Sequence, residues 1–174
     1  MSKIIAFVGS NSATSINEKL LNYAVNHTQL EVLTIDLKRL EVPMYSETEE
    51  NSNGIPKDIS TLKADIEEAS ALIVAVNEHN GTMSAFFKNI TDWLSRTDSQ
   101  YLKHKPIFLL STSPGQGGAQ SSLNYTEENF KKFGGNVVHK FSLPSFGDNF
   151  KDSEMEKTHK EHLKSLLTNF ENDL

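Results

Sequence analysis

Hydroxyl and amide side chains gather in residues 9–17, directly after a short apolar run. They are Ser10, Asn11, Ser12, Thr14, Ser15 and Asn17, followed in the chain by a helix-like stretch that starts at Ile16. Free backbone N–H groups at a helix start, together with hydroxyls, are typical of a site for a phosphate or another anion. The segment has neither the Gly-Lys-Ser/Thr of a Walker A loop nor a Gly-x-Gly-x-x-Gly pattern. A helix cap formed by Thr14 or Ser15 is the alternative interpretation.

A second polar segment follows the most apolar run of the chain, ALIVAV. It comprises Asn77, Glu78, His79, Asn80, Gly81 and Thr82. Asn-Gly is a turn pair, and the amides and backbone groups around it could contact the polar edge of a planar heterocycle. Glu78 and His79 also leave acid–base or metal chemistry open, and a solvated turn remains the simplest alternative.

The third segment, residues 111–118, is rich in serine and glycine. Its candidate ligand contacts are Ser113, Gly115, Gly117 and Gly118. Glycine has no side chain, so the backbone here could approach a flat ligand closely. The alternative is a flexible loop, which the position between an apolar run and a helix-like stretch disfavours.

Composition excludes several kinds of chemistry. The chain has no cysteine, so disulfides, thiolate metal sites, iron–sulfur clusters and thiol nucleophiles are excluded. Redox chemistry would therefore need a bound organic cofactor or a metal without thiolate ligands. No Gly-x-Ser-x-Gly nucleophile motif occurs. The net charge of −6 argues against a nucleic-acid partner. No apolar stretch approaches the ~20 residues of a membrane span, and no signal-peptide pattern is present, so we expect a cytoplasmic protein without a membrane partner.

The candidate segments lie between alternating strand-like and helix-like stretches. Apolar runs of strand length occupy residues 4–8, 30–35, 71–76, 106–110 and 136–141, and amphipathic stretches of helix length occupy residues 16–25, 57–69, 83–94, 118–133 and 152–170. The polar stretch 39–57, with two prolines and an Asn-Gly pair, is predicted to be a long loop. Gly134 and Gly135 are predicted to end the fourth helix. No linker or repeat divides residues 1–174, which we interpret as a single domain.

This alternation predicts an α/β fold. Parallel strands joined by right-handed crossovers give a three-layer sandwich. Five strands fit the flavodoxin-like order 2-1-3-4-5, in which ligands bind at the carboxyl ends of the strands. The segments after the first, third and fourth strands would then meet at one edge of the sheet.

Taken together, the three segments resemble the NADPH-dependent FMN reductase family, which includes chromate, quinone and azo-dye reductases. The first segment is similar to that family's phosphate loop, and the second to its Pro-Glu-Tyr-Asn-Gly segment. The most specific match is the run Phe87-Lys88-Asn89-Ile90-Thr91-Asp92-Trp93-Leu94-Ser95, which is similar to the family's Leu-Lys-Asn-Ala-x-Asp-Trp-Leu-Ser helix. The resemblance covers roughly residues 3–145.

The resemblance implies a flavoprotein oxidoreductase. The first segment would hold the phosphate of FMN, the second would lie along the isoalloxazine ring, and the third would close over the flavin. NADPH or NADH would reduce the flavin, and a small-molecule electron acceptor would reoxidise it. The family also implies a homodimer or homotetramer. The apolar stripe of residues 83–94 is broader than one sheet face needs, so Phe87 and Trp93 are candidates for burial between subunits, with packing in the core as the alternative. A flavodoxin-type electron carrier, which binds FMN without a nicotinamide site, is the alternative function.

The chain departs from the family pattern in three places. Ser12 stands where the family often has arginine, Asn77 replaces the usual proline, and His79 replaces the usual tyrosine. A charge-assisted contact contributes about 1.5–3 kcal/mol. Its loss at Ser12 predicts FMN binding that is roughly tenfold to a hundredfold weaker.

Overall fold

A computed structural model describes residues 3–174 of the chain. Its central sheet is parallel and five-stranded, in the order β2-β1-β3-β4-β5, which confirms the predicted order. The strands are β1 (Ile4–Val8), β2 (Val32–Thr34), β3 (Ala71–Val76), β4 (Pro106–Thr112) and β5 (Asn136–Leu143). Strands β1, β3 and β4 are buried along almost their whole length, as expected for strands covered on both faces.

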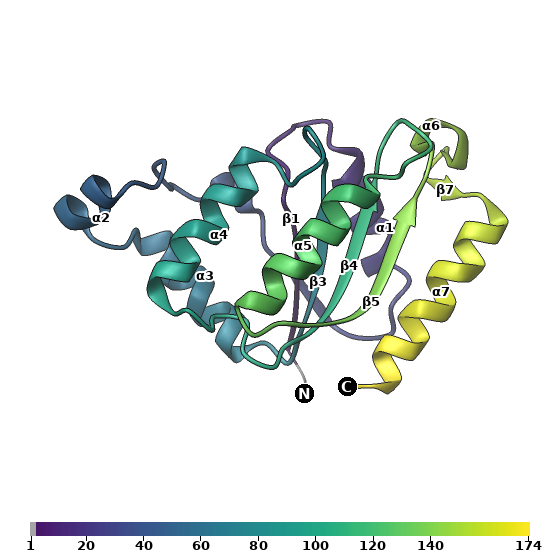
Figure 1. Cartoon of the computed structure of the whole chain (residues 1–174). Coiled ribbons are helices and arrows are strands. Elements are labelled where there is room, and N and C mark those ends of the chain that lie inside the picture. Colours follow the sequence, from purple (N-terminus) through teal and green to yellow (C-terminus); the bar gives the residue numbers. More distant parts are fainter. Residues whose placement is uncertain (1–2) are drawn as a thin grey trace.

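Helices cover both faces of the sheet (Figure 1). One face packs against α3 (Lys57–Glu68), α4 (Ala85–Thr97) and α5 (Gln120–Lys132), and the other against α1 (Ile16–Val25) and α7 (Lys157–Asn172). Successive side chains of β1 point to opposite faces of the sheet. Ile5 and Phe7 therefore join the core beneath α3, α4 and α5, and Ile4 joins the core beneath α1 and α7. The result is the flavodoxin-like three-layer sandwich that the sequence predicts.

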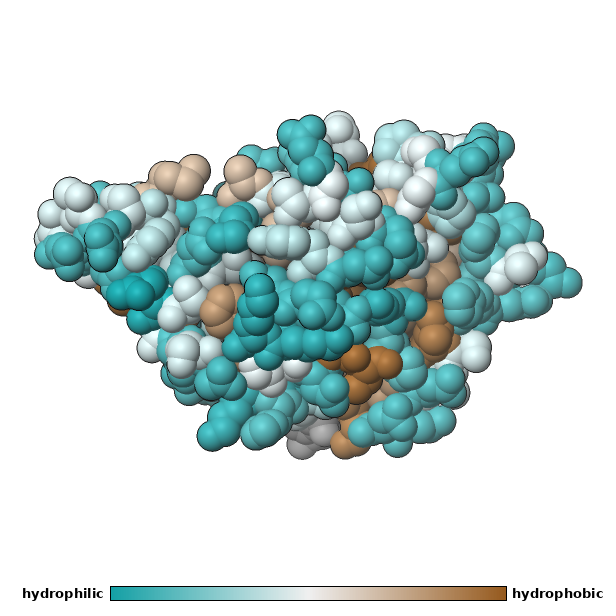
Figure 2. All heavy atoms as spheres, in the orientation of Figure 1, coloured by the Kyte–Doolittle hydropathy of each residue, from teal (hydrophilic) through white to brown (hydrophobic). Residues whose placement is uncertain are grey.

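The exposed surface over α4 and α5 is mainly hydrophilic. Figure 2 shows hydrophobic atoms gathered mainly in the strip between α5 and α7, where β5 runs along the edge of the sheet. No helix formed by residues 3–174 combines the length and apolar character that crossing a bilayer requires.

The stretch 39–57 is not the continuous loop that we predicted. It contains α2 (Glu47–Asn53), and a 3-10 turn, η1 (Leu37–Arg39), ends at its start. Ser46 caps α2 by accepting a hydrogen bond from the amide of Glu49 at 3.1 Å. The first turn of α2 is acidic, which favours a helix start. Ser46 and Glu49 have the Ser-x-x-Glu spacing of a capping box, the sequence signal that our interpretation missed.

The last helix begins five residues later than predicted, at Lys157. The segment before it forms α6 (Phe146–Asn149) and a two-stranded hairpin of β6 (Phe150–Lys151) and β7 (Glu154–Met155). Asp152 and Ser153 form the turn of this hairpin with φ of 50° and 65°, so they cannot belong to a helix. The helix predicted over residues 118–133 is α5, and its predicted end is confirmed, because Gly134 follows it with φ of 85°.

Phe87 and Trp93 do not lie on the surface, so the prediction that they are buried between subunits is wrong. Their exposed fractions are 2% and 0% within one chain. Trp93 also donates a hydrogen bond from its indole nitrogen to the carbonyl of Pro43 at 2.8 Å. The apolar stripe of α4 therefore packs into the core of its own subunit.

Candidate functional site

The three polar segments meet at the carboxyl ends of β1, β3 and β4, where they line one cavity of about 290 Å³. Nine of the residues that we predicted line it: Ser10, Ser12, Ser15, Ile16, Asn17, Asn77, Glu78, His79 and Ser113. Thr14, Thr112 and Pro114 also line it. Thr14 belongs to the hydroxyl-rich first segment, and Thr112 and Pro114 lie in the third segment beside Ser113 but were not among the contacts that we predicted.

The first segment places hydroxyls and a helix start at the cavity. Ser15 is the N-cap of α1, and its Oγ accepts a hydrogen bond from the amide of Glu18 at 3.2 Å. The cap that we gave as an alternative is therefore present. Capping satisfies only one of the four free amides in a first helical turn. The remaining amides and the helix dipole still favour an anion at this position.

The side chain of Asn17 serves the protein's own structure. Its Nδ2 donates to the carbonyl of Thr112 at 3.1 Å, and its Oδ1 accepts from the amide of Thr112 at 2.9 Å. Asn17 is 3% exposed. It therefore fixes the start of α1 against the end of β4, and only its backbone amide remains for a ligand.

Gly9 lies where the first segment packs against the start of α4. A Cβ at Gly9 would lie 2.6 Å from ring atoms of Phe87. The carbonyl of Gly9 accepts a hydrogen bond from Ser84 Oγ at 2.7 Å, and Ser84 is also the N-cap of α4. Gly9 thus allows the first segment to pack closely on the start of α4.

The second segment is held rigidly at both ends. His79 and Thr82 exchange backbone hydrogen bonds of 2.9 and 3.2 Å, which close a turn over Asn80 and Gly81. These two turn residues have φ of 54° and 81°, as an Asn-Gly pair readily adopts. The predicted turn pair is present, but Asn80, Gly81 and Thr82 do not line the cavity.

Glu78 and Asn77 connect this segment to α5. Glu78 Oε2 accepts a hydrogen bond from the amide of Ser122 at 3.0 Å, and Ser122 Oγ donates to the carbonyl of Asn77 at 2.7 Å. The Glu78 carboxylate therefore satisfies an amide in the first turn of α5. No group of three or more His, Asp or Glu side chains among residues 3–174 could hold a metal ion.

Asn77 leaves one polar atom for a ligand. Its Nδ2 lies 3.2 Å from Nε2 of His79, while its Oδ1 is buried and has no hydrogen-bond partner within residues 3–174. A buried polar atom without a partner is costly, and such atoms are normally satisfied. An N–H donor on the polar edge of a flavin ring would satisfy it, so the residues present fit FMN.

The glycines of the third segment fall into two groups. Beside Gly115 and Gly117, a Cβ would meet no atom within 4 Å. Gly118 instead lies against β5, because a Cβ there would be 2.2 Å from Ser142 Oγ. The lack of a side chain at Gly118 therefore lets it pack against the protein's own sheet and not against a ligand. None of the three glycines lines the cavity.

Comparison with known proteins identifies the family. Residues 2–148 match the family described as NADPH-dependent FMN reductase. The chain is 30% identical over 128 residues to an NAD(P)H-dependent FMN reductase of Pseudomonas aeruginosa, covering 71% of this chain and 68% of that protein. It is 29% identical over 115 residues to a subunit of the NADH:(hydroxy)cinnamate reductase of Vibrio ruber. That match covers 66% of this chain and 55%, about half, of the Vibrio protein.

A solved structure shows the same fold. The NAD(P)H:(acceptor) oxidoreductase FerB from Paracoccus denitrificans superposes with a TM-score of 0.80 at 22% identity, covering 99% of this chain and 96% of FerB. The fold is a flavodoxin-like sandwich whose three polar segments converge at one edge of the sheet. The chain belongs to the NADPH-dependent FMN reductase family, whose named relatives are oxidoreductases that use NAD(P)H.

Proposed function

We propose that this chain binds FMN in the cavity at the sheet edge, oxidises NADPH or NADH, and passes the electrons to a small-molecule acceptor. The observation that supports this most is that the three polar segments line one cavity. The unpaired Oδ1 of Asn77 adds a specific place for a polar ligand edge. Family membership supports the same activity.

The first segment would hold the FMN phosphate. Hydroxyls of Ser10, Ser12 and Ser15 line the cavity beside the free backbone amides of Ile16 and Asn17. Amides at a helix start are directed toward an anion, and their dipoles add to the attraction. Because no arginine stands at Ser12, these neutral donors would carry most of the binding to the phosphate.

The second and third segments would contact the flavin ring. Asn77, Glu78 and His79 would lie along its polar edge, and the backbone near Ser113, Gly115 and Gly117 would cover part of it. Bound FMN supplies a ring that accepts a hydride and gives up electrons singly or in pairs. The protein then has to orient the nicotinamide and the acceptor, because orientation itself lowers the barrier. The acceptor could be a flavin, a quinone, an azo compound or a metal oxyanion.

The experiment that tests the proposal measures binding and turnover separately. Purified protein without flavin should quench FMN fluorescence at micromolar concentration, which corresponds to a binding free energy of about −8 kcal/mol. The loaded protein should then oxidise NADPH or NADH when a quinone is added. Quenching without oxidation would instead indicate the electron carrier, and no quenching at ~100 µM FMN would contradict the proposed site.

We also propose a homodimer or homotetramer in the cytoplasm. The family supports the assembly. Met44 is 71% exposed, so its apolar side chain is available for a contact with a second subunit. Light scattering should give a multiple of the chain mass of 19.5 kDa. A particle of the single-chain mass at every concentration would contradict the assembly.

A further inference from the structure

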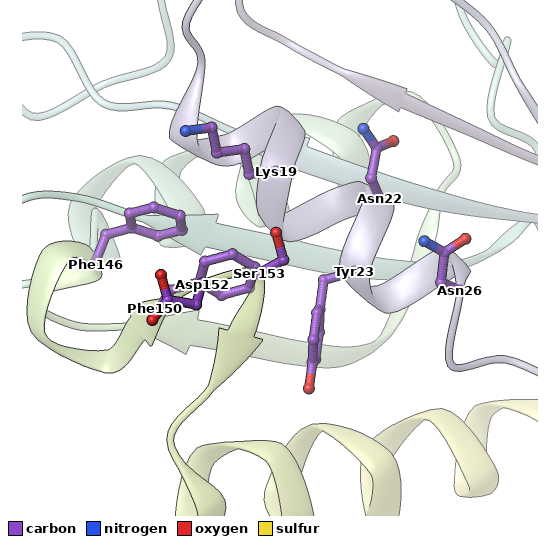
Figure 3. Close-up of a pocket in the computed structure, with 8 residues that line it drawn as sticks. All are labelled: Lys19, Asn22, Tyr23, Asn26, Phe146, Phe150, Asp152 and Ser153. Carbon is purple, nitrogen blue, oxygen red and sulfur yellow. The ribbon is translucent and has the colours of Figure 1, made fainter.

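A second cavity lies between α1 and the β6–β7 hairpin, outside the proposed FMN site (Figure 3). Its volume is about 370 Å³. Its lining residues are Lys19, Asn22, Tyr23, Asn26, Phe146, Phe150, Asp152 and Ser153. None of them belongs to the three segments described above. The volume falls in the range of small-molecule sites.

Aromatic rings form one wall of this cavity. Phe146 and Phe150 are stacked with ring centroids 4.8 Å apart, and Tyr23 meets Phe150 edge-on at 5.3 Å. Tyr23 is held in place by a hydrogen bond from its hydroxyl to Glu154 Oε2 at 3.3 Å. Phe150 remains partly exposed. Tyr23 and Phe146 are each 7% exposed and hold the ring of Phe150 in place. The exposed part of that ring suits a planar ligand, since offset stacking and edge contacts both stabilise such pairs.

Charged and amide groups surround the rings. Lys19, Asn22 and Asn26 come from the exposed face of α1, and Figure 3 shows the Lys19 ammonium extending toward the side where Phe146 lies. The neighbouring carboxylate of Glu18 pairs with Lys38 at 2.8 Å instead of with Lys19. Among the ion pairs of the described residues, none involves Lys19 or Asp152. The cavity therefore offers a free cation and, separately, a free carboxylate.

The hairpin turn places Asp152 at the rim of the cavity, next to the strained Ser153. Asp152 and Ser153 both have positive φ, as the central residues of a two-residue type I′ turn must. Such turns favour Asn-Gly, and a serine at the second position is strained. A glycine would relieve that strain. Strained backbone of this kind clusters at ligand-binding positions.

From this arrangement we infer that the second cavity binds a purine nucleotide. The base would lie against the partly exposed ring of Phe150, and the amides of Asn22 and Asn26 would pair with its hydrogen-bonding edge. The phosphate would pair with the Lys19 ammonium, because a charge-assisted hydrogen bond is the strongest contact available there. The Asp152 carboxylate would accept hydrogen bonds from the sugar hydroxyls. A simple aromatic acid would leave the amides and the carboxylate without partners.

The two cavities share structural elements. Lys19 lies one turn beyond Ser15 on α1, and the amide of Phe146 donates to the carbonyl of Ser113 at 3.0 Å. The nucleotide could therefore be a free one, or the adenylate half of a reduced pyridine nucleotide. The second source rests on the proposed function, whereas binding of the nucleotide itself does not.

Titration of the flavin-free full chain with AMP and with adenosine, followed by calorimetry, tests the site. Lys19→Met should weaken AMP binding about tenfold to a hundredfold and leave adenosine binding unchanged. Phe150→Leu should weaken both ligands, because it removes the flat ring. Lys164→Met, which removes the same charge from an exposed position on α7, should change neither. Equal losses in the two lysine variants, or no AMP binding at millimolar concentration, would overturn the inference.

A second measurement distinguishes the two sources. In the FMN-loaded protein, AMP should raise the KM for NADPH without lowering kcat if the cavity takes the adenylate half, and Lys19→Met should remove that competition. Calorimetric AMP binding without competition would support a free nucleotide. Because AMP binding is measured without flavin, a failure to bind FMN would contradict the proposed function and leave this inference standing.

Discussion

Asn17 and Thr112 lie 95 residues apart in the chain, and their two hydrogen bonds join the start of α1 to the end of β4. One bond uses the amide nitrogen of the Asn17 side chain and the other uses its oxygen. Both are buried. The pair therefore sets the distance between two of the segments that line the proposed FMN site, and any ligand bridging those segments depends on it.

Asn17→Ala should destabilise the protein and weaken FMN binding together. The change leaves the amide and the carbonyl of Thr112 buried without partners, which costs about 2–3 kcal/mol in free energy of unfolding. Denaturant unfolding followed by circular dichroism measures the loss. Asn169→Ala, at an exposed position of α7, is the matched control and should change stability little. A stable Asn17→Ala protein with normal FMN affinity would contradict the bridging role.

Ser15→Ala should weaken FMN binding more than riboflavin binding, because riboflavin lacks the phosphate. The same change removes a helix cap, which costs about 1 kcal/mol of stability by itself. Ser46→Ala removes the equivalent cap of α2, away from the cavity, and so separates the two effects. Fluorescence titration with both flavins gives the comparison. Equal losses for FMN and riboflavin would mean that Ser15 acts only as a cap.

The sequence predicted the sheet and the meeting of the three polar segments better than the contacts of individual side chains. Strand order follows from apolar runs that alternate with amphipathic stretches, a strong and periodic signal. The bond of Asn17 to Thr112 and the contact of Gly9 with Phe87 join residues far apart in the chain. Such contacts depend on how the packed elements meet, so they cannot be predicted from the local composition of either segment.

Where the prediction failed, the local signal was weak or misinterpreted. The hairpin before α7 has strands of two residues each, too short for a periodic pattern. Its Asp-Ser turn lacks the Asn-Gly pair that marks such hairpins. Phe87 and Trp93 were assigned to a subunit interface because the stripe on α4 looked too broad for one face. In the structure, the tyrosine and proline of the 43–45 segment cover that stripe.

Glu127 should contribute to stability in a pH-dependent way. Hydrogen bonds from Lys140 on β5 and from Lys131 hold the pKa of its carboxyl below the ordinary value. Its contribution is therefore fully present above the ordinary carboxyl pKa and is lost as the pH falls through the lowered pKa of the folded state. Glu127→Gln should cost about 0.5–1 kcal/mol at pH 7 and progressively less in acid. Urea unfolding of both proteins across pH 3–7 measures this, and a difference that does not change with pH would contradict the assignment.

The last prediction concerns turnover, for which no single ionisable side chain should be essential. The Glu78 carboxylate is already occupied by the amide of Ser122, and His79 lies in a turn closed by its own backbone. Both residues should act by positioning the second segment, because hydride transfer depends on orientation. Glu78→Gln keeps an acceptor oxygen for the amide of Ser122, so the second segment should stay close to its native position. We expect Glu78→Gln and His79→Ala each to lower kcat about tenfold, with FMN still bound.

Steady-state kinetics of the flavin-loaded variants check this expectation, with Glu128→Gln as the control at an exposed position of α5. A loss of ~10⁴-fold in either variant, with FMN retained, would indicate general acid–base catalysis instead. The second segment carries no Phe, Tyr or Trp that could stack on the flavin, so the nicotinamide and the acceptor should use the same open face in turn. Parallel double-reciprocal plots would support that shared face, and intersecting plots would count against it.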